Sequence, residues 1–217
     1  FTMFAAPPEQ SLEWTDTGVE GGFRFLKKLW KTVAAHIKAG EPGELNPAAI
    51  EGAQKDLRRK THETIKKVSD DYGRRQTFNT AIAAVMELLN EVSRHADRST
   101  PLGLAVEREA LQSAVLVLAP IVPHICHQLW RELGNETSII DQQWPGFDEA
   151  ALAKSSITLI VQVNGKLRAK LDAPADADKE ALEKMALSDE NVAKFIEGKM
   201  IRKVIVVPGK LVNIVAN

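Results

Sequence analysis

The sequence predicts a mainly α protein, in which an antiparallel helical bundle is followed by a small α+β domain with two β-hairpins. From about Thr17 to Leu133, apolar residues recur every three or four positions, which is the period of an amphipathic helix. From Ile157 onward the period is two, and Asn164-Gly165 separates two alternating runs, which is a strong local signal for a hairpin. We place a connecting segment at residues 1–16, the bundle at 17–143, a linker at 144–156 and the small domain at 157–217.

The first two helices of the bundle have recognisable ends. Thr17-Gly-Val-Glu20 is a capping-box pattern, and Gly40-Glu-Pro-Gly43 stops the helix that it begins. Asn46-Pro47 predicts the start of a second helix, which runs to about Tyr72 and ends at Gly73. The apolar spacing predicts one buried face on each helix, formed by Phe23, Leu26, Trp30, Val33 and Ile37 and by Ile50, Leu57, Ile65 and Val68.

Three further helices complete the predicted bundle. The third begins near Thr77, and the fourth follows a polar break at residues 97–100. Pro120 and Pro123 force a kink or a restart before the last short helix. Short connections between amphipathic helices favour antiparallel neighbours. We expect the core to include Phe78, Ile82, Val85, Leu89, Val92, Leu104, Leu111, Val115, Leu118, Ile125, Leu129, Trp130 and Leu133.

The small domain has the order strand, strand, helix or helix pair, strand, strand. Residues 157–163 and 166–171 form the first predicted hairpin. Helical stretches begin near Asp178 and Ser188, and Gly198 stops the second. Residues 200–207 and 211–215 form a second hairpin around Pro208-Gly209, which suits a type II turn.

Composition excludes several classes of protein. The chain has 217 residues, of which 44% are hydrophobic and 26% charged, as in soluble globular proteins. No apolar run approaches eighteen residues and no secretory signal precedes the first helix, so we expect neither a membrane span nor export. Cys126 is the single cysteine, which excludes disulfides within the chain and suits the cytoplasm. The first residue is Phe1 and not Met, so we expect a piece of a longer protein.

No motif for catalysis or metal binding is complete. His62-Glu63-Thr-Ile-Lys66 has a lysine where a zinc motif needs its second histidine. His124, Cys126 and His127 lack a fourth ligand nearby, and no glycine-rich phosphate loop is present. We therefore expect no catalytic centre, metal site or cofactor site in this chain.

Basic residues gather in two places, although 28 Lys and Arg against 29 Asp and Glu make the chain nearly neutral. Between residues 55 and 75 there are eight Lys or Arg and four Asp or Glu. On a helical wheel, a stripe opposite Leu57 holds Lys55, Arg59, His62 and Lys66, flanked by Arg58 and Lys60. Arg74 and Arg75 follow in the next turn. These side chains could bind RNA phosphates, or they could form a solvated face and complement the helix dipole.

The second basic cluster lies in the small domain. Strand alternation places Lys166, Arg168 and Lys170 on one face, opposite Leu167, Ala169 and Leu171. Four more cations lie among twelve residues that contain no acid: Lys199, Arg202, Lys203 and Lys210. They could contact RNA or protect an edge strand from pairing. Because Phe195 is the only aromatic residue of this domain, we expect contacts to phosphates and 2′-hydroxyls and not base stacking.

Several segments resemble aminoacyl-tRNA synthetases of class I. Residues 70–88, Asp-Asp-Tyr-Gly-Arg-Arg-Gln-Thr-Phe-Asn onward, resemble the helical anticodon-binding domain of that class, and Pro120-Ile-Val-Pro-His-Ile125 with Leu129-Trp130 resembles its final helix. The segments 3–14, 161–168 and 202–213 are similar to bacterial-type leucyl-tRNA synthetases. Together these matches cover essentially the whole chain.

The resemblance implies a carboxy-terminal fragment without the ATP-binding signature motifs and the editing domain. ATP and magnesium then belong to the parent enzyme, a leucine–tRNA ligase, and the fragment is not catalytic by itself. The implied partners are tRNA(Leu), whose body the bundle follows and whose elbow the small domain reaches, and the upstream catalytic and editing domains; neither DNA nor a membrane is implied. The alternative is a module that packs on the catalytic body through an apolar patch near Trp14 or Trp30.

Overall fold

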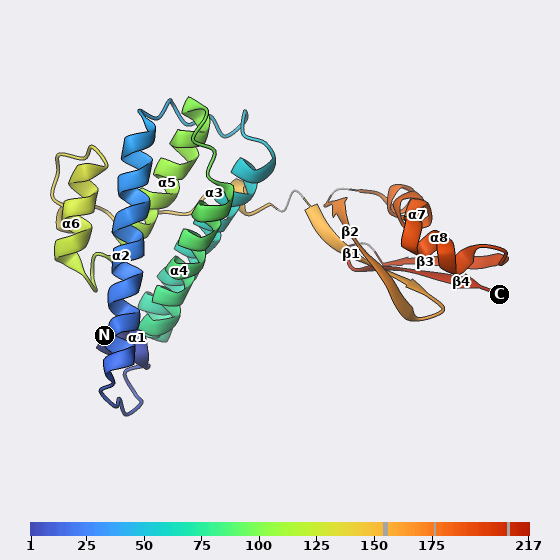
Figure 1. Ribbon diagram of the computed structural model, residues 1–217, viewed down its shortest axis with the longest axis horizontal. Coiled ribbons are helices and arrows are strands. Elements are labelled where there is room, and N and C mark those ends of the chain that lie inside the picture. The colour runs from blue at the N-terminus through green and yellow to red at the C-terminus, as the bar shows by residue number, and fades with distance from the viewer. Residues whose placement is uncertain (154–155, 176, 208) are drawn as a thin grey trace. The chain divides into compact units, whose positions relative to one another are not determined.

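The chain forms two compact units, Phe1–Ala153 and Lys154–Asn217, each with its own hydrophobic core. The structure is a computed structural model that describes residues 1–153, 156–175, 177–207 and 209–217. The first unit is helical and the second is a four-stranded sheet with helices (Figure 1). The predicted fold class is confirmed. Residues 1–16, which we expected to be a connecting segment, and residues 144–153 of the expected linker 144–156 belong to the first unit by their contacts.

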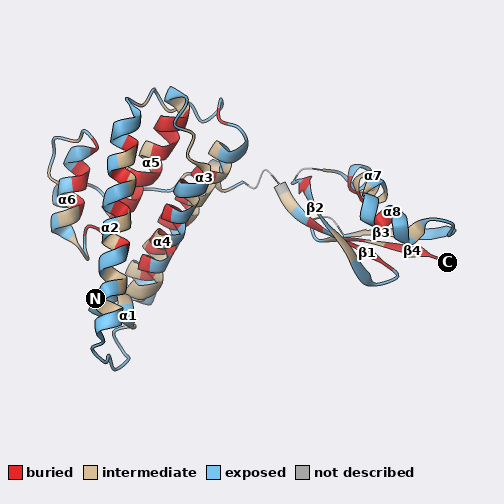
Figure 2. Cartoon of the chain, in the orientation of Figure 1, coloured by how far each residue is buried: buried red, intermediate tan, exposed pale blue. Residues whose placement is uncertain are grey.

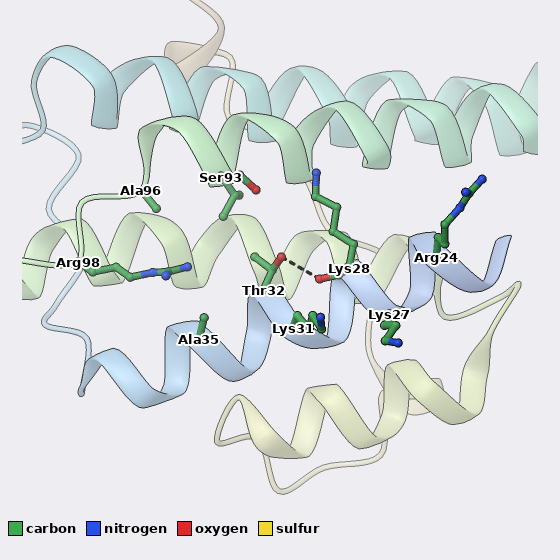
Figure 3. Close-up of a pocket in the computed structure, with 10 residues that line it drawn as sticks. Arg24, Lys27, Lys28, Lys31, Thr32, Ala35, Ser93, Ala96 and Arg98 are labelled. Carbon is green, nitrogen blue, oxygen red and sulfur yellow. Dashed lines mark hydrogen bonds between the residues drawn. The ribbon is translucent and has the colours of Figure 1, made fainter. Parts of the chain in front are cut away.

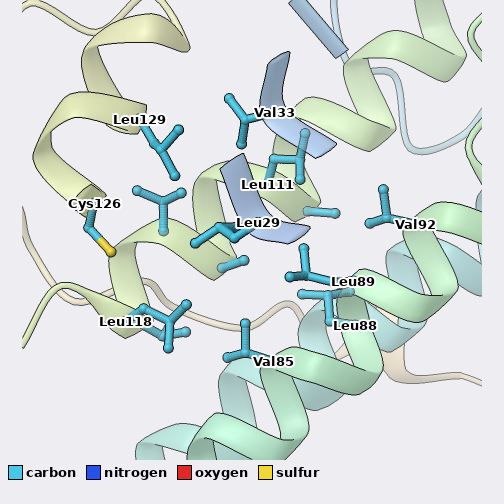
Figure 4. Close-up of a cluster of buried hydrophobic side chains, with 14 of the residues drawn as sticks. Leu29, Val33, Val85, Leu88, Leu89, Val92, Leu111, Leu118, Cys126 and Leu129 are labelled. Atoms are coloured by element: carbon cyan, nitrogen blue, oxygen red, sulfur yellow. The ribbon is translucent and has the colours of Figure 1, made fainter. Parts of the chain in front are cut away.

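The first unit is built around a central helix, α5 (Pro101–Leu118), which contacts α2, α3, α4 and α6. Most of α5 is buried, as Figure 2 shows, and its leucines meet those of the neighbouring helices in the core of Figure 4. The other elements are α1 (Thr2–Ala5), α2 (Asp16–Ala39), α3 (Gly52–Asp70), the π-helical turn η1 (Asp71–Arg75), α4 (Phe78–His95), α6 (Pro123–Glu132), and the short 3-10 turns η2 (Ile139–Asp141) and η3 (Ala150–Leu152).

Helix α2 differs from the prediction at its start and in its buried face. The cap is Thr15, whose hydroxyl accepts a hydrogen bond from the Gly18 amide, so the capping box at Thr17 is wrong. The buried residues are Phe25, Leu29, Val33 and His36, whereas Phe23, Trp30 and Ile37 are exposed. The helix carries apolar residues on more than one side, and packing against α4 and α5 selects the side that includes His36.

Helix α3 begins and ends later than predicted. Asn46 starts a turn, because its side-chain oxygen accepts from the Ala48 amide, and the helix begins at Gly52. Gly73 does not end the helical path, which continues through η1 to Gln76 in the left-handed region. The predicted core residues of α3, Ile50 just before it, and those of α4, α5 and α6 are buried, except that Phe78 and Ile125 are half-buried.

The second unit contains two antiparallel hairpins joined by one parallel pairing. The strands β1 (Ser156–Val163), β2 (Lys166–Pro174), β3 (Ile201–Val207) and β4 (Leu211–Ala216) lie in the order β2-β1-β4-β3. Asn164 and Gly165 both have positive φ, as a two-residue turn of the predicted kind requires. The second predicted turn falls partly on residue 208, which lies outside the described residues.

One face of this sheet is covered and the other is free. Helices α7 (Lys179–Ser188) and α8 (Glu190–Ile196) bury Leu182 and Val192 against the side chains of Leu159, Val161 and other strand residues. The opposite face carries residues of the alternate strand positions, such as Ile160 and Ile205, which remain exposed. A sheet with one covered face thus offers a surface to solvent in the domain expected to bind RNA.

Candidate nucleic-acid interface

Arg58, a predicted RNA contact on α3, is buried and held by two carboxylates. Its Nε donates to Glu109 at 3.1 Å and its terminal nitrogen to Asp148 at 3.0 Å. His62 is buried beside it: its Nδ1 accepts from the Asp148 amide and its Nε2 donates to Glu109. The expected exposure is therefore wrong for His62 in the polar stripe and for Arg58 beside it, because the chain near Asp148 folds back over this face of α3. We do not retain Arg58 as a contact.

The remaining cations of α3 are mostly paired. Arg59 donates to Glu63 at 2.8 Å and to Asp56 at 3.3 Å, and although burial opposes its charge, these bonds raise its pKa. Lys66 lies 3.6 Å from a Glu149 oxygen and over the ring of Phe147. Lys55 is exposed and makes no ion pair with any described residue. The α3 surface is thus much less positive than its count of basic residues indicates.

Arg74 and Arg75 are anchored at the end of α3. Arg74 binds both oxygens of Asp70, at 2.7 and 2.8 Å, and Arg75 donates to Asp71 at 3.1 Å. Asp71 is fully buried; burial raises its pKa, but hydrogen bonds from Lys67 and Thr80 outweigh that effect and lower it. These pairs favour a structural role for the two arginines at the end of α3. The arginines bind carboxylates of the preceding turn.

In the second unit, the predicted alternation of β2 is interrupted by a β-bulge. Val161 pairs with Ala169 and Gln162 with Leu167, so Arg168 is an extra residue between them. Its guanidinium lies 3.7 Å from the ring centre of Phe195 on α8, and thus on the covered side of the sheet. Lys170 pairs with Ile160 on the free side. The expectation of one shared face for Lys166, Arg168 and Lys170 is therefore wrong.

The free face of the sheet combines apolar residues with lysines on both edge strands. Lys170 lies on β2 and Lys203 on β3, the two outer strands of the sheet. Between and beside them lie Ile160, Leu167 and Ile205, of which Leu167 is the most exposed at 52%. We call the set Ile160, Leu167, Lys170, Lys203, Ile205 and Val207 the free sheet face.

The predicted contacts of this unit differ from most of those on α3, because none of them pairs with a carboxylate of a described residue. Among the described residues no ion pair involves the seven predicted contacts of the unit, Lys166, Arg168, Lys170, Lys199, Arg202, Lys203 and Lys210. Five of them are lysines, and all five are exposed. Unpaired cations at the surface remain available to an external anion without loss of an internal ion pair.

Chemistry other than ion pairing is weakly represented. The described part of the chain holds no group of three or more His, Cys, Asp or Glu placed to bind a metal ion. Cys126 is fully buried, and burial raises the pKa of its thiol to about 12. No described helix is both long and apolar enough to cross a bilayer. Charged side chains, and the large apolar side chains exposed in and near α2, are the surface features that could act on a partner.

Comparison with protein families identifies the chain. Residues 54–183 match the family described as the anticodon-binding domain of tRNA ligase. The chain belongs to this family. The match begins within α3 and ends within α7, so it takes in α3 to α6 of the first unit and the first hairpin of the second.

The similarity of this chain to known proteins extends beyond the family match. It is 74% identical over 217 residues to a leucine–tRNA ligase of Saccharophagus degradans and 69% identical to that of Cellvibrio japonicus, and it covers 26% and 25% of those proteins. A chain in the crystal structure of the ternary complex of Agrobacterium radiobacter K84 agnB2 LeuRS-tRNA-LeuAMS aligns with 99% of it, at a TM-score of 0.75 and 25% identity, over 27% of that chain. The protein thus spans about a quarter of the length of these relatives.

Sequence reasoning missed one cluster of cations in the first unit. Helix α2, outside the family match, carries four basic residues without a carboxylate between them, at the helical spacing i, i+3, i+4 and i+7: Arg24, Lys27, Lys28 and Lys31. The spacing alone would have placed them on neighbouring turns. The sequence contains this spacing of basic residues, but the same segment was interpreted only through its apolar residues.

Proposed function

We propose that the chain is the carboxy-terminal tRNA-binding portion of a leucine–tRNA ligase, which positions tRNA(Leu) for aminoacylation elsewhere in the parent protein. The observation that supports this most is the 74% identity to such a ligase over every residue of the chain. ATP and magnesium would act in the upstream catalytic domain, and this portion would not be catalytic by itself. The parent enzyme would work in the cytoplasm, with the upstream catalytic and editing domains as partners in the same chain.

The physical basis of the proposal is contact between cations and the sugar–phosphate backbone. Each phosphate that a Lys or Arg neutralises releases condensed counterions, so binding weakens as salt increases. Lys170 and Lys203 are exposed and have no ion pair with a described residue, so neither must break an internal pair to bind RNA. The free sheet face therefore presents charge at both edges and an apolar surface that could lie against ribose. Lys55, Lys166, Lys199 and Lys210 are further candidates.

Salt-dependent binding of tRNA(Leu) tests this function. The double variant Lys170→Gln, Lys203→Gln removes two phosphate contacts, so the slope of log Kobs against log salt should become less negative by about 2. The control Lys179→Gln, Lys184→Gln removes the same charge from exposed positions on α7 and should leave the slope nearly unchanged. No binding of tRNA by the unmodified chain at low salt would contradict the proposal.

A second function, packing against another protein surface, is favoured by exposed aromatic residues. Trp14 is 67% exposed, Phe23 64% and Trp30 43%, in and near helix α2. Large exposed apolar side chains indicate protein interaction when they form a patch. Self-association in sedimentation velocity that Trp30→Ser reduces, together with no salt-dependent RNA binding, would support this function over the first.

A further inference from the structure

A basic groove lies between α2 and α4. It has a volume of about 490 Å³ and is shown in Figure 3. Its walls contain five cations and no carboxylate. Arg24, Lys27, Lys28 and Lys31 come from α2, and Arg98 comes from the segment before α5. The rest of the lining consists of small or uncharged side chains, including Thr32 and Ser93. We call it the α2–α4 groove. No residue of this groove was among the contacts that the sequence predicted.

Three cations of the α2–α4 groove are free to bind an external anion. Arg24, Lys27 and Lys31 are exposed and form no ion pair with a residue that the structure describes. Lys28 donates to the side-chain oxygen of Asn90, which is neutral and leaves its charge uncompensated. Arg98 alone is paired, with Glu107. The groove is therefore strongly positive, in contrast to the paired surface of α3.

The polar groups of the groove walls indicate recognition by charge alone. The hydroxyls of Thr32 and Ser93 donate to the carbonyl oxygens of Lys28 and Leu89 in their own helices, so they do not point a donor into the groove. No aromatic side chain and no side-chain amide lines it, so it offers neither a stacking surface for bases nor a bidentate amide contact to a base edge. This lining suits a strand that presents its phosphates, and it does not suit recognition through stacked bases.

The free cations form a row that is long enough to meet more than one phosphate of a strand. From Arg24 to Lys31 the helix rises seven residues, or about 10.5 Å. Neighbouring phosphates of one strand lie farther apart along the backbone than the rise of about 3.4 Å per charge along a duplex axis, so a row of this length meets more than one phosphate but not a long run of them. We propose that the α2–α4 groove is a second RNA-binding site, which holds the backbone of one strand of a tRNA stem. This inference rests on the proposed function and extends it to α2, outside the family match.

Lysine footprinting of the complete 217-residue chain tests the groove directly. The chain is acetylated in three samples of equal ionic strength: alone, with a tRNA(Leu) transcript, and with inorganic phosphate. The modified lysines are then identified by mass spectrometry. We expect tRNA to protect Lys27 and Lys31 several-fold, phosphate to protect neither, and Lys179 and Lys184 to react equally in all samples. Protection by inorganic phosphate equal to that by tRNA would mean a small-anion site and would overturn the assignment to RNA.

A pair of variants provides a second measurement. Lys27→Gln, Lys31→Gln should make the salt slope of tRNA binding less negative by about 2, whereas Lys179→Gln, Lys184→Gln should not. Both groove lysines are exposed, so circular dichroism should show an unchanged fold. If tRNA binds and protects only lysines of the second unit, with an unchanged slope for the groove variant, this inference is wrong and the proposed function stands. If the unmodified chain binds no tRNA, both are wrong.

Discussion

Replacing Glu107 by glutamine should destabilise the helical unit, because this carboxylate is fully buried and joins three elements. It accepts from His36 of α2 at 3.1 Å and from Arg98 at 2.6 to 3.2 Å. His36 in turn accepts at its Nε2 from Arg108, so its Nδ1 carries the proton donated to Glu107. Glutamine has nearly the same size, but it loses the charge and turns an NH₂ group toward one of these donors.

The expected loss is set by the burial of the site. Removing one partner of a buried ion pair costs about 3 to 5 kcal/mol, since the other charge is left uncompensated. Arg98 is partly exposed, so water can hydrate its guanidinium and the lower end, about 3 kcal/mol, is expected. With a urea m-value of about 2 kcal/mol/M, the midpoint should fall by about 1.5 M. Glu87→Gln on α4 is the control: its side chain is 66% exposed and pairs with Lys60 at the surface, so its loss should be clearly smaller.

Tryptophan fluorescence is the suitable assay, since all four tryptophans, Trp14, Trp30, Trp130 and Trp144, lie in the first unit and report its unfolding alone.

The pH dependence of the stability provides a second check. Burial raises the pKa of Glu107, but its bonds to His36 and Arg98 outweigh this and hold the pKa below the ordinary 4.5. The stabilisation is therefore complete above about pH 4.5 and is lost as the pH falls through the lower, folded value. A loss below about 1 kcal/mol, or one that stays constant down to pH 3, would refute the reasoning.

Two further predictions concern packing in the first unit. Cys126 is fully buried with a pKa near 12, so a thiol reagent at pH 8 should label it only after unfolding, and fast labelling of the native chain would contradict its burial. At Gly103 a Cβ would stand 2.1 Å from the backbone oxygen of Asp97, so Gly103→Ala should lower the free energy of unfolding by about 2 kcal/mol or more. Gly22→Ala, where a Cβ meets nothing within 4 Å, should be neutral or stabilising in the same urea titration.

The sequence by itself determined the elements that depend on local signals. The period of three to four placed α4, α5 and α6, because side chains three and four positions apart lie on the same side of a helix whatever its neighbours are. Asn164-Gly165 placed the first hairpin, because both residues tolerate positive φ. The motifs around residues 70–88 indicated the family to which the chain belongs.

Tertiary structure decided which charges remain free, and the reason is that ion pairs join residues distant in sequence. Arg58 meets Asp148, ninety positions away, so no local pattern could show that it is buried. The bulge at Arg168 depends on its register with β1, and it moves that side chain to the face opposite to the predicted one. The buried face of α2 was likewise selected by α4 and α5. Periodicity follows from the geometry of one segment, but the electrostatic surface follows from how the segments meet.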